Sequence, residues 1–130
     1  LRPAIGSGTI VICDRFYDST RVYQGIVGGV PEADIEALNT LACGSLVPDL
    51  TILLDMDVDE GLRRADERQT AETRFESKGI DFHRKVREGF LELAARFGDR
   101  FVVIDAGRDI DHVTSEIEAA VLPRLSVALR

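Results

Sequence analysis

The sequence lacks the features that would direct the protein to a membrane or a secretory pathway. Its apolar runs are all shorter than the roughly 18 residues that a membrane-spanning helix needs. The first residues, LRPAIGSG, do not show the charged start and apolar core of a signal peptide. They also contain no initiator methionine, so we expect the chain to begin partway through a longer one of roughly 200 residues.

Cysteine and positive charge are also scarce. Cys13 and Cys43 stand among apolar residues without metal-site spacing, which predicts core thiols in a cytoplasmic protein. The 23 acidic residues outnumber the 16 basic ones, and the net charge of −7 argues against a nucleic acid as the main partner. A local arginine cluster could still hold a small anion. The 130 residues are enough for one domain with one core.

The pattern of the chain alternates between strands and helices. Buried strands are expected at residues 9–14, at about 50–55 and within RFVVIDAG, residues 100–107, because these runs are apolar without a period of two. Helices are expected at 4–7 (closed by Gly8), from Pro31 to 43, at 58–68, at 81–97 and from Asp109 or Asp111 to about 129, where Pro123 would bend or end the last one. Strands separated by helices predict a parallel α/β sheet covered on both faces.

Each of the three expected strands ends in an aspartate, namely Asp14, Asp55 and Asp105. The carboxyl ends of parallel strands share one edge of the sheet, and ligands bind outside that edge. The alternative is that these carboxylates only cap turns, and for Asp55 and Asp105 it weighs as much as the functional interpretation.

The stretch CDRFYDSTRVYQG, residues 13–25, concentrates side chains that suit a nucleotide. Arg15 is a charged fork suited to phosphate, and Asp14 is the type of carboxylate that holds magnesium directly or through water. A helical turn from Asp18 to Gly25 would bring together the donors and acceptors that can contact a base and a sugar: Ser19, Thr20, Tyr23 and Gln24.

A second basic cluster consists of Arg63, Arg64, Arg68 and Arg74. It spans a charged helix and an irregular segment, which is typical of a mobile lid that carries transition-state arginines, here at about residues 64–77. The alternative is a solvated helix face with Glu–Arg pairs. Farther on, Phe82, Val86 and Phe90 form an apolar stripe that predicts core packing, and His83 and His112 are interpreted as surface residues.

Taken together, four segments resemble the C-terminal part of the bacterial thymidylate kinases, which phosphorylate dTMP with ATP. They are CDRFYDSTRVYQG, PDLTILLDMDVDEGLRR, TRFESKGIDFHRKVREGFLELA and VVIDAGRDIDHV. The resemblance covers essentially all 130 residues. It implies a P-loop NTPase-type parallel sheet of strand order 2-3-1-4-5, of which this chain would supply the third, fourth and fifth strands.

The resemblance also implies roles for residues. Arg15 would contact the dTMP phosphate, and Asp14 would help to place Mg²⁺ and that phosphate through water. The remaining acceptor-site roles would fall to Ser19 and Thr20 (base), Tyr23 (deoxyribose, against a 2′-hydroxyl) and Gln24 (pocket lining). Arg64, Arg68 and Arg74 would belong to the lid over ATP, with Arg68 favoured as catalytic and Arg64 next, and Ala106 and Gly107 would lie beside adenine. The family is typically homodimeric and cytoplasmic.

The departure from the family is the phosphate-binding loop, because no G-x-x-x-x-G-K-[ST] occurs in the sequence. GSG at 6–8 lacks the lysine, and GIVGG at 25–29 does not follow a strand. The strand between the third and fourth would also be missing. We therefore expect a partial domain that is inactive by itself and is either poorly stable or associates. Kinases for other nucleoside monophosphates, and a non-catalytic nucleotide-binding or assembly module, remain alternatives.

Overall fold

The computed structural model describes residues 1–68 and 79–128, which divide into two compact units, one up to Pro48 and one from Asp49 onward. The first unit holds α1 (Arg2–Gly6), α2 (Tyr17–Thr20), the π-helix η1 (Arg21–Ile26) and α3 (Glu32–Cys43). The second holds β1 (Thr51–Asp55), α4 (Val58–Arg68), α6 (Ile80–Arg96), β2 (Phe101–Asp105) and α7 (Ile110–Ala128). The predicted lid falls largely on residues 69–78, outside the described part of the chain.

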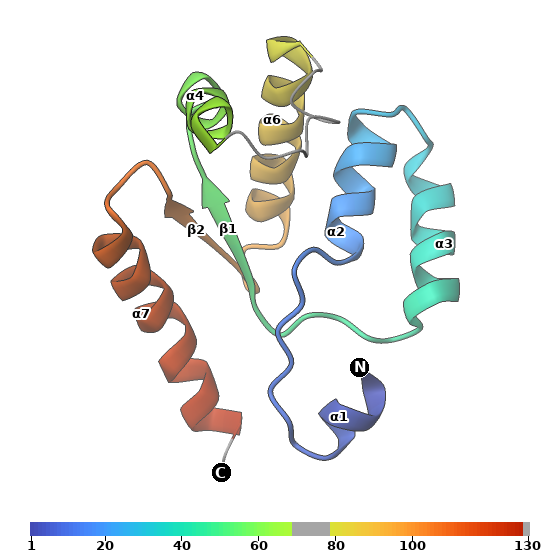
Figure 1. Cartoon of the computed structure of the whole chain (residues 1–130). Helices are drawn as coiled ribbons and strands as arrows, with labels where there is room; N and C mark the ends of the chain where they lie inside the picture. Colours follow the sequence, from blue (N-terminus) through green and yellow to red (C-terminus); the bar gives the residue numbers. More distant parts are fainter. Residues whose placement is uncertain (69–78, 129–130) are drawn as a thin grey trace. The chain divides into compact units, whose positions relative to one another are not determined.

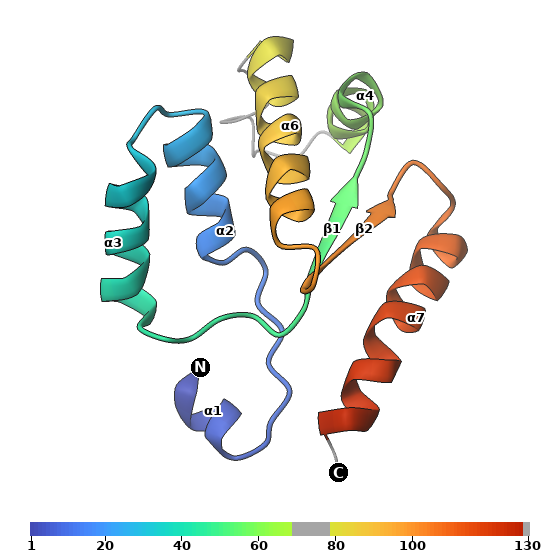
Figure 2. The same cartoon turned by 180° about the vertical axis from the view of Figure 1, so that it is seen from behind.

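The second unit is built on a parallel pair of strands with helices on its two sides (Figures 1 and 2). Thr51 lies opposite Phe101 at one end of the pair, and Asp55 lies opposite Asp105 at the other. Phe101 and Ile104 are buried, as are Val86 and Leu93 on the apolar stripe of α6, so the core of this unit forms where that stripe meets the strands. The predicted α/β class, with parallel strands and flanking helices, is confirmed.

The first unit is helical. The segment 17–26, formed by α2 and η1, packs against α3 (Figure 1). Val22 and Ile35 are almost fully buried where the two helices meet. The helix predicted from Pro31 is confirmed, with Pro31 as its N-cap residue and Gly44 ending it at φ +63°, a conformation that glycine adopts without strain. The spacing of Ile35, Leu38 and Leu41 predicts an apolar face on this helix, but only Ile35 is buried, whereas Leu38 and Leu41 are exposed.

The strand expected at residues 9–14 is wrong. In the part of the chain that the structure describes, β1 and β2 pair with each other, and neither pairs with this segment. A strand needs a neighbour to satisfy its backbone N–H and C=O groups, and an apolar sequence alone does not supply one. As a consequence Ile12 is 94% exposed. Cys13 is exposed as well, so its assignment as a core thiol is also wrong.

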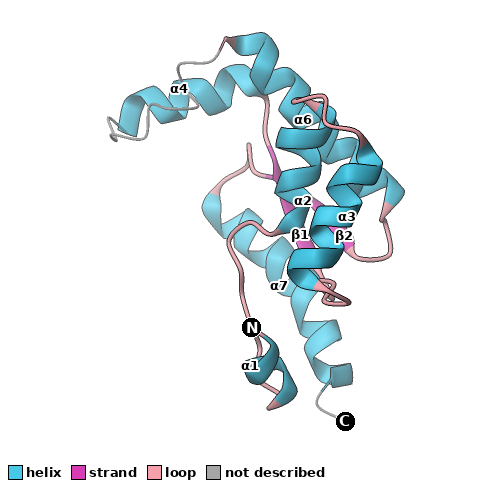
Figure 3. Cartoon of the chain, turned by 90° about the vertical axis from the view of Figure 1, so that its right-hand side faces the viewer, coloured by secondary structure: helices cyan, strands magenta, loops and turns pink. Residues whose placement is uncertain are grey.

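The last helix begins as predicted and ends later than a proline would suggest. The Asp109 Oδ1 atom accepts a hydrogen bond from the His112 backbone N–H at 2.9 Å, which confirms Asp109 as the cap and lowers the pKa of its carboxyl group. Pro123 does not end the helix, because α7 continues to Ala128 without a break (Figure 3). The next residue, Arg124, donates to the backbone oxygens of Asp49 at 3.0 Å and Asp99 at 2.8 Å, and so anchors this turn.

Candidate functional site

The Asp-Arg pair occupies a turn with an unusual backbone. Arg15 has a φ of +63°, and it alone has a positive φ among the non-glycine residues that the structure describes. This left-handed conformation costs an L-residue free energy and is found disproportionately at functional sites. The Arg15 guanidinium lies 5.5 Å from the centroid of the Tyr23 ring, and both Arg15 and Asp14 are exposed. The structure therefore brings together two of the predicted site residues, one charged and one aromatic.

The remaining predicted acceptor-site residues lie on the segment 17–26, which we call the acceptor helix. Ser19, Thr20 and Tyr23 are partly buried and Gln24 is exposed. The predicted helical turn is confirmed, but its second half is π-helical, with the Val27 N–H donating to the Val22 oxygen at 2.9 Å. Such turns are rare and often occur at functional sites, and nothing in the sequence indicated this one.

A charged network holds the acceptor helix from its other side, and sequence reasoning missed it. Arg21 donates to both carboxylate oxygens of Glu36 at 2.6 Å and to Asp18 at 2.9 Å, and its guanidinium lies 4.7 Å from the centroid of the Tyr17 ring. Asp18 is only 5% exposed. The spacing of three between Asp18 and Arg21 was a usable signal, whereas nothing local pointed to Glu36.

In the second unit, Arg64 reaches the loop after β2. Its Nη1 and Nη2 atoms donate to the carbonyl oxygens of Ala106 at 3.2 Å and Gly107 at 3.3 Å, and its Nε donates to Glu60 at 2.6 Å. The contact joins Arg64, predicted as a lid residue, to Ala106 and Gly107, which were predicted to lie beside adenine. Asp105 caps the same loop through the Gly107 N–H at 2.9 Å, so its interpretation as a turn cap is confirmed.

The other arginines of the basic cluster differ from Arg64. Arg63 is more than half exposed and pairs with Glu60 and Glu67 on the surface of α4, as a solvated helix face would. Hydrogen bonds from Arg63 and then Arg64 lower the pKa of Glu60 to about 2. The side chain of Arg68 and the whole of Arg74 lie outside the described residues, so their lid roles stay predictions.

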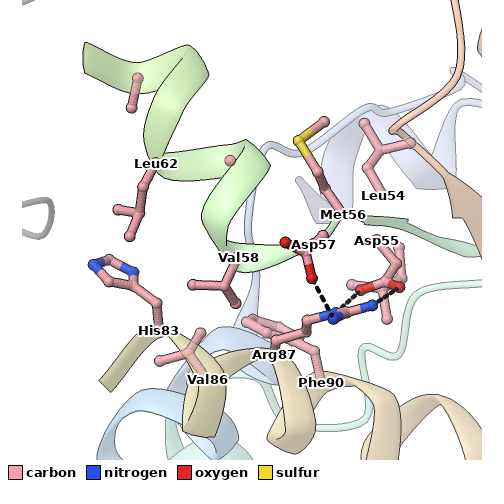
Figure 4. Close-up of a pocket in the computed structure, with 13 residues that line it drawn as sticks. Leu54, Asp55, Met56, Asp57, Val58, Leu62, His83, Val86, Arg87 and Phe90 are labelled. Carbon is pink, nitrogen blue, oxygen red and sulfur yellow. Dashed lines mark hydrogen bonds and ion pairs between the residues drawn. The ribbon is translucent and has the colours of Figure 1, made fainter. Parts of the chain in front are cut away.

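The carboxyl end of β1 is bound by a basic residue of α6. Arg87 donates to the two Asp55 oxygens at 2.7 and 2.9 Å and lies 3.8 Å from Asp57 (Figure 4). This fork, more than any other contact, lowers the pKa of Asp55. The pair lies at one end of a largely apolar pocket of about 300 Å³ formed by β1, α4 and α6. The sequence gave no sign of it, because 32 residues separate the partners.

His83 lines the same pocket, so its assignment to the surface is wrong. Its Nε2 atom is buried and makes no hydrogen bond within the described part of the chain. His112 is partly exposed and lies 3.4 Å from Glu116. The stripe next to His83 is mixed, because Val86 is buried while Phe82 and Phe90 are partly exposed.

Asp55 gives a prediction for acid stability. Because its pKa is lower in the folded protein than in the unfolded chain, the contribution of the Asp55–Arg87 pair is complete above the unfolded value of about 3.9 and is lost as the pH falls through the folded value. Asp55→Asn is therefore expected to destabilise the protein at pH 7 by roughly 1–2 kcal/mol and to flatten the loss of stability below about pH 4. Urea unfolding across this range measures both effects.

Asp81→Asn is the matched control, because this carboxylate also lies beside an α6 arginine but its side chain is 88% exposed. Little change is expected from it at either pH. If Asp55→Asn lost stability below pH 4 as steeply as the parent protein, the lowered pKa of Asp55 would be contradicted.

Comparison with known proteins gives a family match over most of the chain. The family model described as thymidylate kinase matches residues 1–117. The chain is 48% identical to the thymidylate kinase of Caulobacter vibrioides, over 98% of this chain and 61% of the relative. It is also 48% identical to the thymidylate kinase of Trichlorobacter lovleyi, over 96% and 61%. The chain belongs to the thymidylate kinase family. The mixed helix and strand architecture agrees with the P-loop NTPase-type fold expected for that family.

Within the thymidylate kinase family the chain covers only part of each relative, about three fifths of the length of the two relatives above (61%). The acceptor helix of the first unit and, separately, the Arg64 contacts of the second unit fall inside the matched residues. A search of the described residues finds no helix long and apolar enough to cross a membrane.

Proposed function

We propose that the protein containing this chain transfers the γ-phosphate of ATP to dTMP. The observation that carries the proposal is the family match, which spans nearly the whole chain and includes relatives named thymidylate kinase at 48% identity. The structure adds support, because Arg15, on a strained turn, lies beside Tyr23 of the acceptor helix. A charged fork suits the phosphate of a nucleotide, and an aromatic face beside it can contact the attached ring.

On this proposal the first unit holds the acceptor nucleotide. Arg15 grips the dTMP phosphate, and its exposure leaves the fork accessible to a ligand. Tyr23 lies against the deoxyribose and disfavours a 2′-hydroxyl. The base is contacted by Thr20 most directly and by Ser19, and Gln24 lines the same pocket; all three side chains offer both donors and acceptors.

The second unit holds part of the ATP site. Arg64 ties α4 to the loop of Ala106 and Gly107, so the helix and the loop present one surface to the adenine. Because its guanidinium is engaged in this contact, Arg64 fits ATP binding better than stabilisation of the charge on the transferred phosphate. Arg68 is then the favoured catalytic arginine, with Arg74 next.

Mg²⁺ would be held mainly by nucleotide phosphates and water, with Asp14 as its proposed contact in this chain. Among the described residues no group of three or more Asp, Glu, His or Cys side chains could enclose a metal, and both Asp55 oxygens are engaged by Arg87. Asp14 is exposed and can contribute one contact through water, which agrees with the preference of Mg²⁺ for few protein ligands. When bound, the ion would neutralise charge on the ATP phosphates.

In the proposed reaction the protein forms no covalent intermediate and acts by positioning and charge stabilisation. An oxygen of the dTMP phosphate attacks the γ-phosphorus of ATP in line, the bond to the β-phosphate oxygen breaks, and dTDP and ADP form. Arg15 contributes by orienting the attacking phosphate, and lid arginines contribute by stabilising the charge that spreads over the transferred group.

The test is a coupled phosphoryl-transfer assay on the longest reading frame that contains this chain, with dTMP, dUMP, dCMP, AMP and GMP as acceptors. A clear preference for dTMP is the expected result. Preference for another monophosphate would reassign the base while keeping the reaction class. No transfer to any acceptor would overturn the catalytic proposal and leave a nucleotide-binding or assembly module.

We also infer that the protein acts in the cytoplasm as a homodimer. The two free thiols of the chain suit a reducing compartment. The exposed Leu38 and Leu41 on α3 give an apolar surface that a second copy could cover.

A further inference from the structure

We propose that Arg21 is a positioning residue, which holds the acceptor helix on α3 through Glu36. The proposal rests on the proposed function, because the helix concerned carries the side chains assigned to the nucleoside monophosphate. The Arg21 guanidinium is engaged by Glu36 of α3, so its proposed action on the ligand passes through the helix.

The first step of the argument is the weakness of the helix itself. Arg21 is the first residue of the π-helical turn that ends at Ile26. A π-helix is rare because its backbone geometry is unfavourable, and it persists only where surrounding contacts support it. This turn contains Tyr23 and Gln24, so any relaxation toward a regular α-helix would rotate both side chains.

The second step is the contact that supports the turn. One part of this contact is apolar, because Val22 and Ile35 are almost fully buried. A Cβ atom at Gly25 would lie 3.5 Å from Ile35 Cγ1, so η1 and α3 pack closely. The other part is the fork of Arg21, which makes two parallel hydrogen bonds of 2.6 Å to Glu36. Apolar packing tolerates sliding and rotation better than a bidentate pair, which fixes direction as well as distance.

The third step is the burial of the network. The Arg21 side chain is 15% exposed and that of Asp18 is 7% exposed, so these charges are shielded from salt and water. Arg21 also joins the start of the acceptor helix to its π-helical half through Asp18. The Glu36 side chain is 40% exposed, which makes it the partner that can be changed with least damage to folding.

The test uses the longest reading frame that contains this chain, with the variants Glu36→Gln, Arg21→Lys and the two combined. Glu36→Gln removes the ion pair, and Arg21→Lys keeps the charge but loses the fork. Each is expected to raise the KM for dTMP by about tenfold, with the KM for ATP within about twofold of the parent value. The combined variant is expected to be no worse than the more affected single one, because both remove the same contact. Asp34→Asn, which removes an exposed charge from the same helix, is the matched control and should leave both KM values unchanged.

Amide hydrogen exchange over residues 20–26, measured without nucleotide, gives a second result that does not depend on activity. Faster exchange in Glu36→Gln than in Asp34→Asn is expected. A lower melting temperature with unchanged KM values would overturn the proposal and leave a structural ion pair only. If the parent protein transfers phosphate to no acceptor, the proposed function fails, and the role of Arg21 is then decided by exchange alone, where unchanged rates overturn it.

Discussion

Arg15→Ala is expected to raise the KM for dTMP by about 100-fold or more, while the KM for ATP changes by less than about twofold. The change removes the guanidinium fork proposed to grip the acceptor phosphate. Arg21 lies in the same unit but cannot substitute, because its donors are engaged by Glu36 and Asp18. Steady-state kinetics with each substrate varied in turn measure the two values. Arg15→Lys should recover only part of the loss, since an ammonium keeps the charge without the planar pair of donors.

The backbone at Arg15 allows a further check within the same set of variants. Alanine keeps the strained φ of +63°, whereas glycine adopts it freely. Arg15→Gly is therefore expected to be as poor in dTMP binding as Arg15→Ala but more stable by about 1 kcal/mol. Equal loss of dTMP and ATP binding would remove Arg15 from the acceptor site. Equal stability of the two variants would show that the turn is not strained.

Local signals in the sequence were enough to predict most elements of the fold. The stripe on α6 repeats at the period of a helix, the runs of β1 and β2 are continuously apolar as in buried strands, and Gly44 stops α3 because of its own backbone freedom. These features depend on neighbours within one or two turns of chain. Their prediction therefore does not depend on how distant parts of the chain fold.

The strand expected at residues 9–14 failed for the opposite reason. Its residues, among them the exposed Ile10 and Ile12, have strand composition, but a strand exists only with a hydrogen-bonded neighbour. Within the described ranges, neither strand of the sheet pairs with this segment. Strand-like composition makes a segment able to form a strand, but the strand forms only when a neighbouring strand pairs with it.

The candidate site residues also differ in whether local sequence could identify them. Arg15 and Tyr23 are eight positions apart on one continuous turn and helix, and the sequence predicted both as site residues. The partners Arg87 and Glu36 come from other elements, and no local pattern identifies them. Adjacent arginines were equally hard to separate. Arg63 and Arg64 differ by about 100° around α4, so one faces solvent and the other faces the loop after β2.

That difference predicts opposite outcomes for the two neighbours. Arg64→Ala is expected to raise the KM for ATP by about 10- to 100-fold, because it frees the loop of Ala106 and Gly107 from α4 and removes a cation beside the proposed adenine site. The KM for dTMP should stay within about twofold of the parent value. Arg63→Ala removes the same charge from the same helix, so it controls for long-range electrostatics and for helix propensity. It should change neither KM, since its partners Glu60 and Glu67 are surface residues of α4 itself.

The outcome also separates two roles for Arg64. A loss confined to the KM for ATP, with kcat retained, would identify Arg64 as a binding residue and strengthen the case for Arg68 as the catalytic arginine. A fall in kcat with the KM for ATP unchanged would mean that Arg64 leaves the loop and reaches the transferred phosphate during turnover, and the contact with the two carbonyls would then describe a resting state. Equal effects of the two substitutions would attribute the change to charge alone and contradict a specific role for the Arg64 contact.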